Sequence, residues 1–148
     1  MKFLIINGPN LNMLGQREVN HYGAKTLDEL KTFTEAKLKT LKDISVVWKE
    51  SNVEGEIVTM IQEAIGKFDG LIINPGGFSH TSVAILDALL LFGNPKAEVH
   101  ISRASRRGDS YRERLITANG VDILLEGLGD LSYFIAVQAL YEHINLKK

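Results

Sequence analysis

Apolar and polar residues follow one another in blocks along this chain. Short continuous apolar runs occupy residues 3–6, 45–48, 70–73, 97–101 and 121–125. Continuous rather than alternating apolarity predicts strands that are buried on both faces. Between these runs, residues with helical spacing occupy 26–41, 53–65, 81–91 and 131–144. Thr26 and Glu29 have the spacing of a capping box, which predicts the start of the first of these helices.

This alternation predicts an α/β fold. Each parallel strand needs a crossover to reach the next, so the blocks indicate a five-stranded parallel sheet with helices on both faces, a three-layer sandwich. We predict the strand order 2-1-3-4-5, which brings the loops after the first, third and fourth strands to one crevice. A chain of 148 residues suffices for one such unit, so we expect a single domain over 1–148.

Composition excludes several classes of function. A net charge of −1 gives no chain-wide attraction to nucleic acid or anionic membrane, and the arginines at 103, 106 and 107 are expected in a solvated loop. The absence of cysteine excludes disulfides, thiolate metal sites and a cysteine nucleophile. No apolar run approaches the ~20 residues that span a bilayer, and the first residues lack a secretory pattern. We therefore expect a cytoplasmic protein.

The loop after the first strand is long and polar, and it carries side-chain amides together with Arg17 and Tyr22. Connections of this length are typically functional loops or lids. A tyrosine becomes a base near neutral pH only when a cation stabilises its phenolate, and Arg17 has the charge to do so. The alternative is that both side chains decorate the surface.

The loop after the third strand, residues 74–82, is rich in glycine and hydroxyl groups. We expect Ser79, His80 or Thr81 near the cap of the next helix, where free backbone amides suit an anion such as a carboxylate. The simpler interpretation is a glycine turn followed by a helix cap. The loop has neither a dinucleotide fingerprint nor the lysine of a P-loop.

The fourth predicted strand carries Glu98 and His100, two residues apart and hence on one face. A carboxylate that holds an imidazole fixes its tautomer and makes it a suitable general acid near neutral pH. A satisfied structural pair is the alternative.

The sequence lacks the usual motifs of acyl transfer by a serine nucleophile and of metal binding. No serine lies in a Gly-x-Ser-x-Gly elbow, and the four histidines lack short ligand spacing, so we predict no metal site. Proton transfer remains, with a base on the first loop and an acid on the fourth strand.

Several motifs in this order resemble the type II 3-dehydroquinate dehydratases. They are Asn7-Gly8-Pro9-Asn10-Leu11-Asn12, Leu14-Gly15, Arg17-Glu18, Tyr22-Gly23, Ser51-Asn52, Glu54-Gly55-Glu56, Asn74-Pro75-Gly76, His80-Thr81-Ser82 and Glu98-Val99-His100-Ile101-Ser102. The resemblance implies a flavodoxin-like fold. It also implies removal of water from 3-dehydroquinate to give 3-dehydroshikimate, by anti elimination through an enolate and without a cofactor, in the shikimate pathway.

The resemblance also implies roles for individual residues. Tyr22 matches the base, with Arg17 lowering its pKa, and Asn12 matches the residue that holds a water on the enolate. His100 matches the general acid, oriented by Glu98. The residues implied to bind substrate are Asn74, His80, Ile101, Ser102, Arg112 and, from an adjacent subunit, Asp87. The family implies a homo-oligomer, usually a dodecamer built from trimers.

The segment after Ser102 departs from the family pattern, because Arg103 replaces the usual asparagine and one residue is added. Arg107 or Arg114 could therefore take the place expected for Arg112. Because of this altered segment, an alternative interpretation is a family member that has lost its activity or that acts in quinate catabolism. A flavodoxin-like binding or signalling module is a further alternative, although Asn7-Gly8-Pro9 stands where a receiver domain would carry acidic residues.

Overall fold

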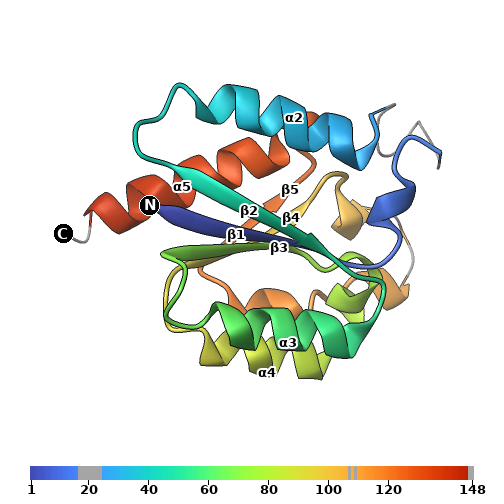
Figure 1. Cartoon of the computed structure of the whole chain (residues 1–148). Helices are drawn as coiled ribbons and strands as arrows, with labels where there is room; N and C mark the ends of the chain where they lie inside the picture. The colour runs from blue at the N-terminus through green and yellow to red at the C-terminus, as the bar shows by residue number, and fades with distance from the viewer. Residues whose placement is uncertain (17–24, 107, 109, 147–148) are drawn as a thin grey trace.

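A computed structural model describes residues 1–16, 25–106, 108 and 110–146. Five parallel strands form one sheet in the order β2-β1-β3-β4-β5, which confirms the predicted order (Figure 1). The strands are β1 (Lys2–Asn7), β2 (Ser45–Glu50), β3 (Gly70–Asn74), β4 (Lys96–His100) and β5 (Ile123–Glu126). All five predicted apolar runs therefore contribute a strand.

In the described part of the chain, two α-helices cover each face of the sheet. One face is covered by α2 (Leu27–Leu38) and α5 (Ser132–Leu146), and the other by α3 (Glu54–Ala64) and α4 (Val83–Leu91) (Figure 1). This arrangement confirms the three-layer sandwich. The four helices lie within or close to the predicted stretches.

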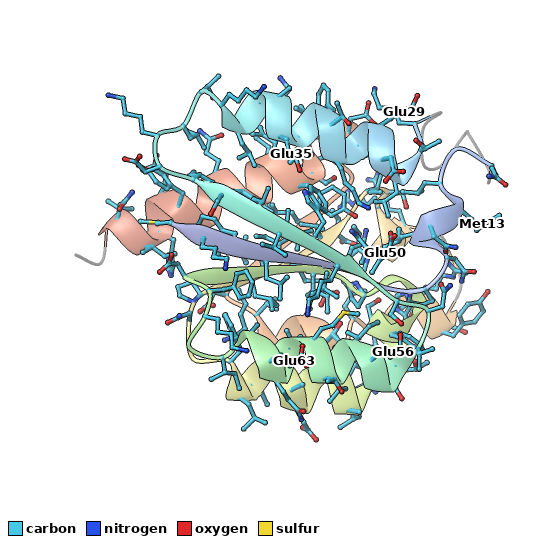
Figure 2. The ribbon with its side chains drawn as sticks, viewed as in Figure 1. Met13, Glu29, Glu35, Glu50, Glu56 and Glu63 are labelled. Atoms are coloured by element: carbon cyan, nitrogen blue, oxygen red, sulfur yellow. The ribbon has the colours of Figure 1, made fainter. Side chains whose placement is uncertain are left out.

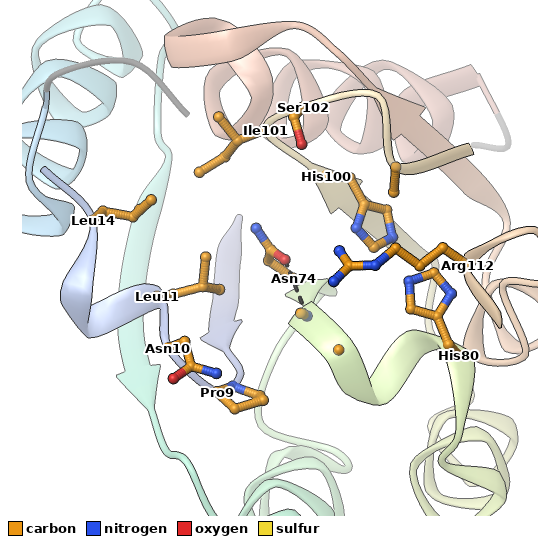
Figure 3. A pocket seen from close by; sticks show the side chains of 13 residues that line it. Pro9, Asn10, Leu11, Leu14, Asn74, His80, His100, Ile101, Ser102 and Arg112 are labelled. Atoms are coloured by element: carbon orange, nitrogen blue, oxygen red, sulfur yellow. Dashed lines mark hydrogen bonds between the residues drawn. The ribbon is translucent and has the colours of Figure 1, made fainter. Parts of the chain in front are cut away.

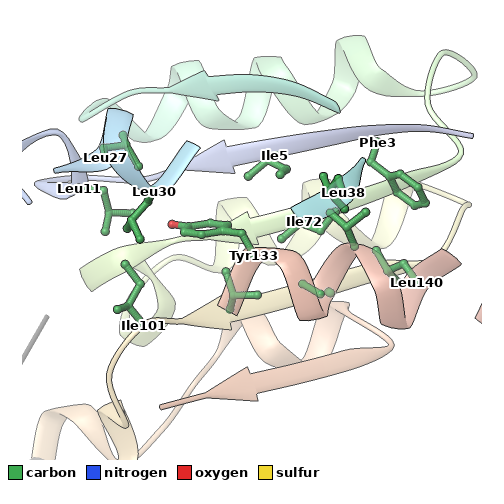
Figure 4. Packing of buried hydrophobic residues seen from close by; sticks show 14 of the residues in the cluster. Phe3, Ile5, Leu11, Leu27, Leu30, Leu38, Ile72, Ile101, Tyr133 and Leu140 are labelled. Carbon is green, nitrogen blue, oxygen red and sulfur yellow. The ribbon is translucent and has the colours of Figure 1, made fainter. Parts of the chain in front are cut away.

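Alternate residues of β1 serve the two cores. Phe3 and Ile5 pack in the cluster beneath α2 and α5, whereas Leu4 and Ile6 pack in the cluster against α3 and α4. All four are buried, as expected for a central strand that is covered on both faces. Figure 4 shows the first cluster, in which the Tyr133 ring lies between α5 and the sheet.

Two helix starts show how the sequence sets the boundaries. Thr26 and Glu29 form the predicted capping box on α2, and Figure 2 shows Glu29 in the first turn of that helix. The cap of α4 is Ser82, whose Oγ accepts from the Ile85 amide at 2.9 Å. Thr81 directly precedes this cap, as expected of a residue near the helix start, whereas Ser79 and His80 belong to a separate 3-10 turn over residues 76–80.

The loops after β1 and β3 pack directly against each other. The Gly8 amide donates to the Asn74 carbonyl at 2.8 Å, and a Cβ added at Gly8 would lie only 2.6 Å from the Pro75 carbonyl oxygen. Gly76 has a φ of 56° and faces the Pro9 carbonyl. Only glycine permits this close approach, which joins the two loops at the carboxyl edge of the sheet.

Candidate active site

A cavity of about 200 Å³ lies at the carboxyl edge of the sheet, where the crevice was predicted. Its walls come mainly from the loops after β1, β3 and β4. Lining residues are Pro9, Asn10, Leu11, Leu14, Asn74, Gly76, Gly77, His80, His100, Ile101, Ser102, Ala104 and Arg112. In Figure 3 the residues of the first loop lie on one side and His80, His100 and Arg112 on the other. Apolar side chains therefore face a cluster of nitrogen-bearing ones.

The structure brings six of the predicted site residues to this cavity. They are Asn74, His80, His100, Ile101, Ser102 and Arg112. Of the three arginines considered for the altered segment, Arg112 lines the cavity, whereas Arg114 contributes a backbone carbonyl that pairs with His80. Arg107 lies outside the described residues.

Four further predicted residues belong to the first loop and to α4. Arg17 and Tyr22 fall outside the described residues. Asn12 is exposed and does not line the cavity, because the 3-10 turn Leu11–Met13 directs it to solvent, and Asn10 lines the cavity instead. Asp87 is exposed on α4, away from the cavity of its own chain.

Asn10 is a site residue that the sequence prediction missed. Its φ of 67° lies in the left-handed region, which asparagine tolerates better than most residues. The Asn10 amide donates to Asn52 Oδ1 at 2.8 Å, which holds this turn against the loop after β2. The Asn-Gly-Pro-Asn motif was the available signal, since it places two turn-forming residues before this position.

Glu98 and His100 form the predicted pair at the end of β4. His100 Nε2 lies 2.7 Å from Glu98 Oε1, and both side chains are buried, with exposed fractions of 0% for Glu98 and 6% for His100. A carboxylate oxygen accepts from the ring nitrogen, so Nε2 carries a proton and Nδ1 is the other ring nitrogen available at the cavity wall. The imidazole is thereby held in one orientation.

Thr117 completes this pair and was also missed. Its Oγ1 donates to Glu98 Oε2 at 2.7 Å, and Thr117 is itself fully buried. The residue lies in the 3-10 turn Thr117–Gly120, which the Ile116 amide anchors to the Ser79 carbonyl at 2.6 Å. Both carboxylate oxygens are therefore engaged, as a buried charge requires.

His80 has a defined tautomer on the same side of the cavity as His100 (Figure 3). Its Nδ1 lies 2.9 Å from the Arg114 carbonyl oxygen, which can only accept, so Nδ1 carries the proton. In the neutral ring Nε2 is then an acceptor. His80 can therefore receive a hydrogen bond from a hydroxyl group of a ligand.

The side chains at the cavity suit a small anion. Arg112 offers a planar guanidinium that suits a carboxylate, and Asn74 offers an amide. Among the described residues, no group of three or more His, Cys, Asp or Glu side chains could hold a metal ion. In the same part of the chain, no helix has the length and apolarity to cross a membrane.

The model of one protein family, described as dehydroquinase class II, matches residues 1–141. This chain belongs to the class II dehydroquinase family. The membership favours the enzymatic interpretation of the sequence over a flavodoxin-like binding or signalling module.

Curated relatives and solved structures agree with this class II dehydroquinase assignment. The 3-dehydroquinate dehydratase of Bartonella tribocorum is 46% identical over 97% of this chain and 96% of its own length. That of Fusobacterium nucleatum is 47% identical over 98% of this chain and 99% of its own length. The crystal structure of the type II dehydroquinase from Butyrivibrio crossotus is similar with a TM-score of 0.90 at 40% identity, covering 95% of this chain and 97% of that one.

Proposed function

We propose that this class II dehydroquinase removes water from 3-dehydroquinate to give 3-dehydroshikimate, as a step of the shikimate pathway. The proposed reaction is an anti elimination through an enolate, without a cofactor. The observation that carries the proposal is the buried Thr117–Glu98–His100 chain at the wall of a cavity lined by Asn74, His80 and Arg112. The chain's relatives named 3-dehydroquinate dehydratase support the choice of substrate.

His100 is the proposed general acid. The leaving hydroxyl of the substrate must receive a proton to depart as water. The imidazolium form of His100 would donate it from Nδ1, and the neutral ring that results keeps its Nε2 proton on Glu98. Glu98 stabilises the imidazolium and fixes its direction. General acid catalysis by a positioned side chain contributes about 10²- to 10⁴-fold to a rate.

The base is proposed to be Tyr22, with Arg17 stabilising its phenolate. Both residues belong to the first loop, whose described part lines the cavity through Pro9, Asn10 and Leu11. We assign the water on the enolate to Asn10 instead of Asn12, since Asn10 has its side chain at the cavity.

Substrate binding is proposed to use the groups on the opposite wall. Arg112 would pair with the carboxylate, and the amides of Ile101 and Ser102 would bind the same group and the neighbouring hydroxyl. His80 Nε2 would accept from a ring hydroxyl, and Asn74 would donate to an oxygen.

The proposed assembly is a homo-oligomer, with trimers that build a dodecamer. Val83, Asp87, Leu90 and Leu91 have the spacing of one helical face of α4, and the three apolar members are 55%, 62% and 64% exposed. Exposed apolar side chains gathered on one face of a helix are typical of a protein contact. Asp87 lies within this stripe and would enter the cavity of the adjacent copy. We propose that residues 1–148 act as one catalytic domain, and that the enzyme is cytoplasmic.

Turnover of 3-dehydroquinate tests this proposal. Purified protein is mixed with 3-dehydroquinate, and the ultraviolet absorbance of the conjugated enone is followed at several pH values. A steady rise that depends on enzyme concentration is expected. Folded protein that produces no enone at any pH would falsify the proposed activity.

A further inference from the structure

Three buried polar side chains form a chain that ends at the cavity. Asn7 lies on β1, Asn74 on β3 and Tyr133 on α5, and their exposed fractions are 0%, 3% and 0%. Tyr133 lies among apolar residues beneath α5, as Figure 4 shows. Burying the Tyr133 hydroxyl costs free energy unless it forms hydrogen bonds. Its hydrogen bonds to Asn7 and Asn74 therefore fix the orientation of these three side chains.

The directions of these hydrogen bonds follow from the donors available. The Tyr133 hydroxyl donates to Asn7 Oδ1 at 2.5 Å, and its oxygen accepts from Asn74 Nδ2 at 3.2 Å. Burial raises the pKa of the Tyr133 phenol, so it keeps its single proton. Because this proton is donated to Asn7, the Tyr133 hydroxyl can only accept a hydrogen bond from Asn74.

The other end of the Asn74 amide is fixed as well. The Gly76 backbone amide donates to Asn74 Oδ1 at 3.2 Å, the bond drawn in Figure 3. Rotating the amide by half a turn would set its oxygen against the Tyr133 oxygen and its NH₂ against the Gly76 N–H. Both hydrogen bonds would be lost in a buried place.

We propose that Tyr133 is a positioning residue, which holds the Asn74 amide so that the second N–H of Nδ2 serves the cavity and selects an acceptor oxygen of the ligand. This inference rests on the proposed function, in which Asn74 contacts the substrate. Reversal of the amide would present a carbonyl oxygen to a carboxylate or hydroxyl oxygen, which repels an anion. Tyr133 acts only through Asn74 and does not itself line the cavity.

The protein itself contains a residue for a matched control variant and a tryptophan that serves as a fluorescent reporter. Tyr141 lies on the same helix and packs against the same cluster, so Tyr141→Phe removes a hydroxyl without touching Asn74. Trp48 is the only tryptophan of the chain, and its ring centroid lies 5.2 Å from that of Tyr133 at 65°. Trp48 fluorescence therefore reports the environment of Tyr133 directly.

The first test compares Tyr133→Phe with Tyr141→Phe and the wild type. Asn74 is proposed to bind substrate and transition state alike, so its misorientation should raise KM and leave kcat nearly unchanged. For Tyr133→Phe we expect KM for 3-dehydroquinate, and Kd for 3-dehydroshikimate by Trp48 fluorescence, to rise about tenfold. Tyr141→Phe should match the wild type. A lowered melting temperature with unchanged KM and Kd would overturn the proposal in favour of a purely structural hydroxyl.

A second measurement needs no turnover and no ligand. In ¹⁵N-labelled protein, hydrogen exchange of the Asn74 Nδ2 protons should be at least tenfold faster in Tyr133→Phe than in the wild type, because one of their acceptors is gone. Equal exchange rates would overturn the positioning role. Wild-type protein that turns over nothing contradicts the proposed function, whereas equal exchange contradicts this inference alone.

Asn7→Leu tests the same hydrogen-bonded network of Asn7, Tyr133 and Asn74 if Tyr133→Phe does not fold. This variant removes the acceptor of the phenol proton, while Asn7 Nδ2 has no hydrogen-bond partner to lose among the described residues. The freed hydroxyl can then donate toward Asn74 and favour the reversed amide. We expect faster Asn74 exchange and weaker binding again, and wild-type values for both would refute the proposal.

Discussion

Replacing Thr117 with valine removes one hydrogen bond and almost no volume. The lost bond is the one from Thr117 Oγ1 to Glu98 Oε2, a distance of 2.7 Å between two fully buried side chains. Glu98 would then keep only the bond to His100 at 2.7 Å. Its second oxygen would be a buried charged acceptor without a partner, so the carboxylate would turn toward a new donor.

The charge and the burial of the Glu98 carboxylate set the size of the expected loss in stability and in rate. A hydrogen bond to a charged group contributes about 1.5–3 kcal/mol, and the whole desolvation cost appears when its partner is removed. This range corresponds to roughly 10- to 100-fold in a rate if the lost orientation is felt by His100 in the transition state. Because His100 is proposed to act only in the chemical step, kcat and kcat/KM should fall together.

Two assays separate the catalytic effect from a general loss of structure. Denaturant unfolding should give a free energy of unfolding lower by about 1.5–3 kcal/mol for Thr117→Val. Steady-state turnover of 3-dehydroquinate should give the fall in kcat. Thr117→Ser keeps the hydroxyl and should retain most of kcat, although it loses a buried methyl group. Wild-type kcat and stability in Thr117→Val would contradict the proposed role of the Thr117–Glu98 hydrogen bond in orienting His100.

Three further predictions follow from particular contacts. Gly8→Ala should lower the free energy of unfolding by about 1–3 kcal/mol in denaturant, because its Cβ would lie 2.6 Å from the Pro75 carbonyl oxygen; Gly55→Ala, where no atom lies within 4 Å, should cost nothing. Hydrogen bonds from the Thr26 backbone and side chain hold the pKa of Glu29 below its ordinary value, so its stabilisation is present above about pH 4.5 and is lost as pH falls through the folded pKa. Glu29→Gln should therefore differ from wild type in unfolding at pH 7 and converge with it in acid; a constant difference would contradict this. Leu91→Asp should reduce the mass measured by light scattering, whereas Leu146→Asp at the 85% exposed end of α5 should not, and equal masses would contradict the proposed contact.

The fold could be predicted because its determinants are local. Continuous apolar runs marked the buried strands, and the handedness of parallel crossovers limited the order in which they can pair. The capping box at Thr26 and Glu29 depends on residues three apart, so it was readable in the sequence. The cap at Ser82 was missed because four polar residues in a row compete for that role, and the preceding 3-10 turn decides between them.

Individual hydrogen bonds of the site were predictable from spacing only where the two partners are close in sequence. Glu98 and His100 pair because side chains two apart share a face of a strand. Thr117 lies 19 residues from Glu98 and Tyr133 lies 126 residues from Asn7, so no spacing rule connects them. Asn10 and Asn12 differ by the rotation of one 3-10 turn, which sequence patterns do not resolve.

The most direct test of the account is enone formation from 3-dehydroquinate by the wild type and by His100→Gln, followed in the ultraviolet under identical conditions. The account predicts turnover by the wild type and a fall in kcat of about 10²- to 10⁴-fold for a folded His100→Gln variant, because the leaving hydroxyl loses its proton donor. Equal rates for the two proteins would contradict the proposed role of His100.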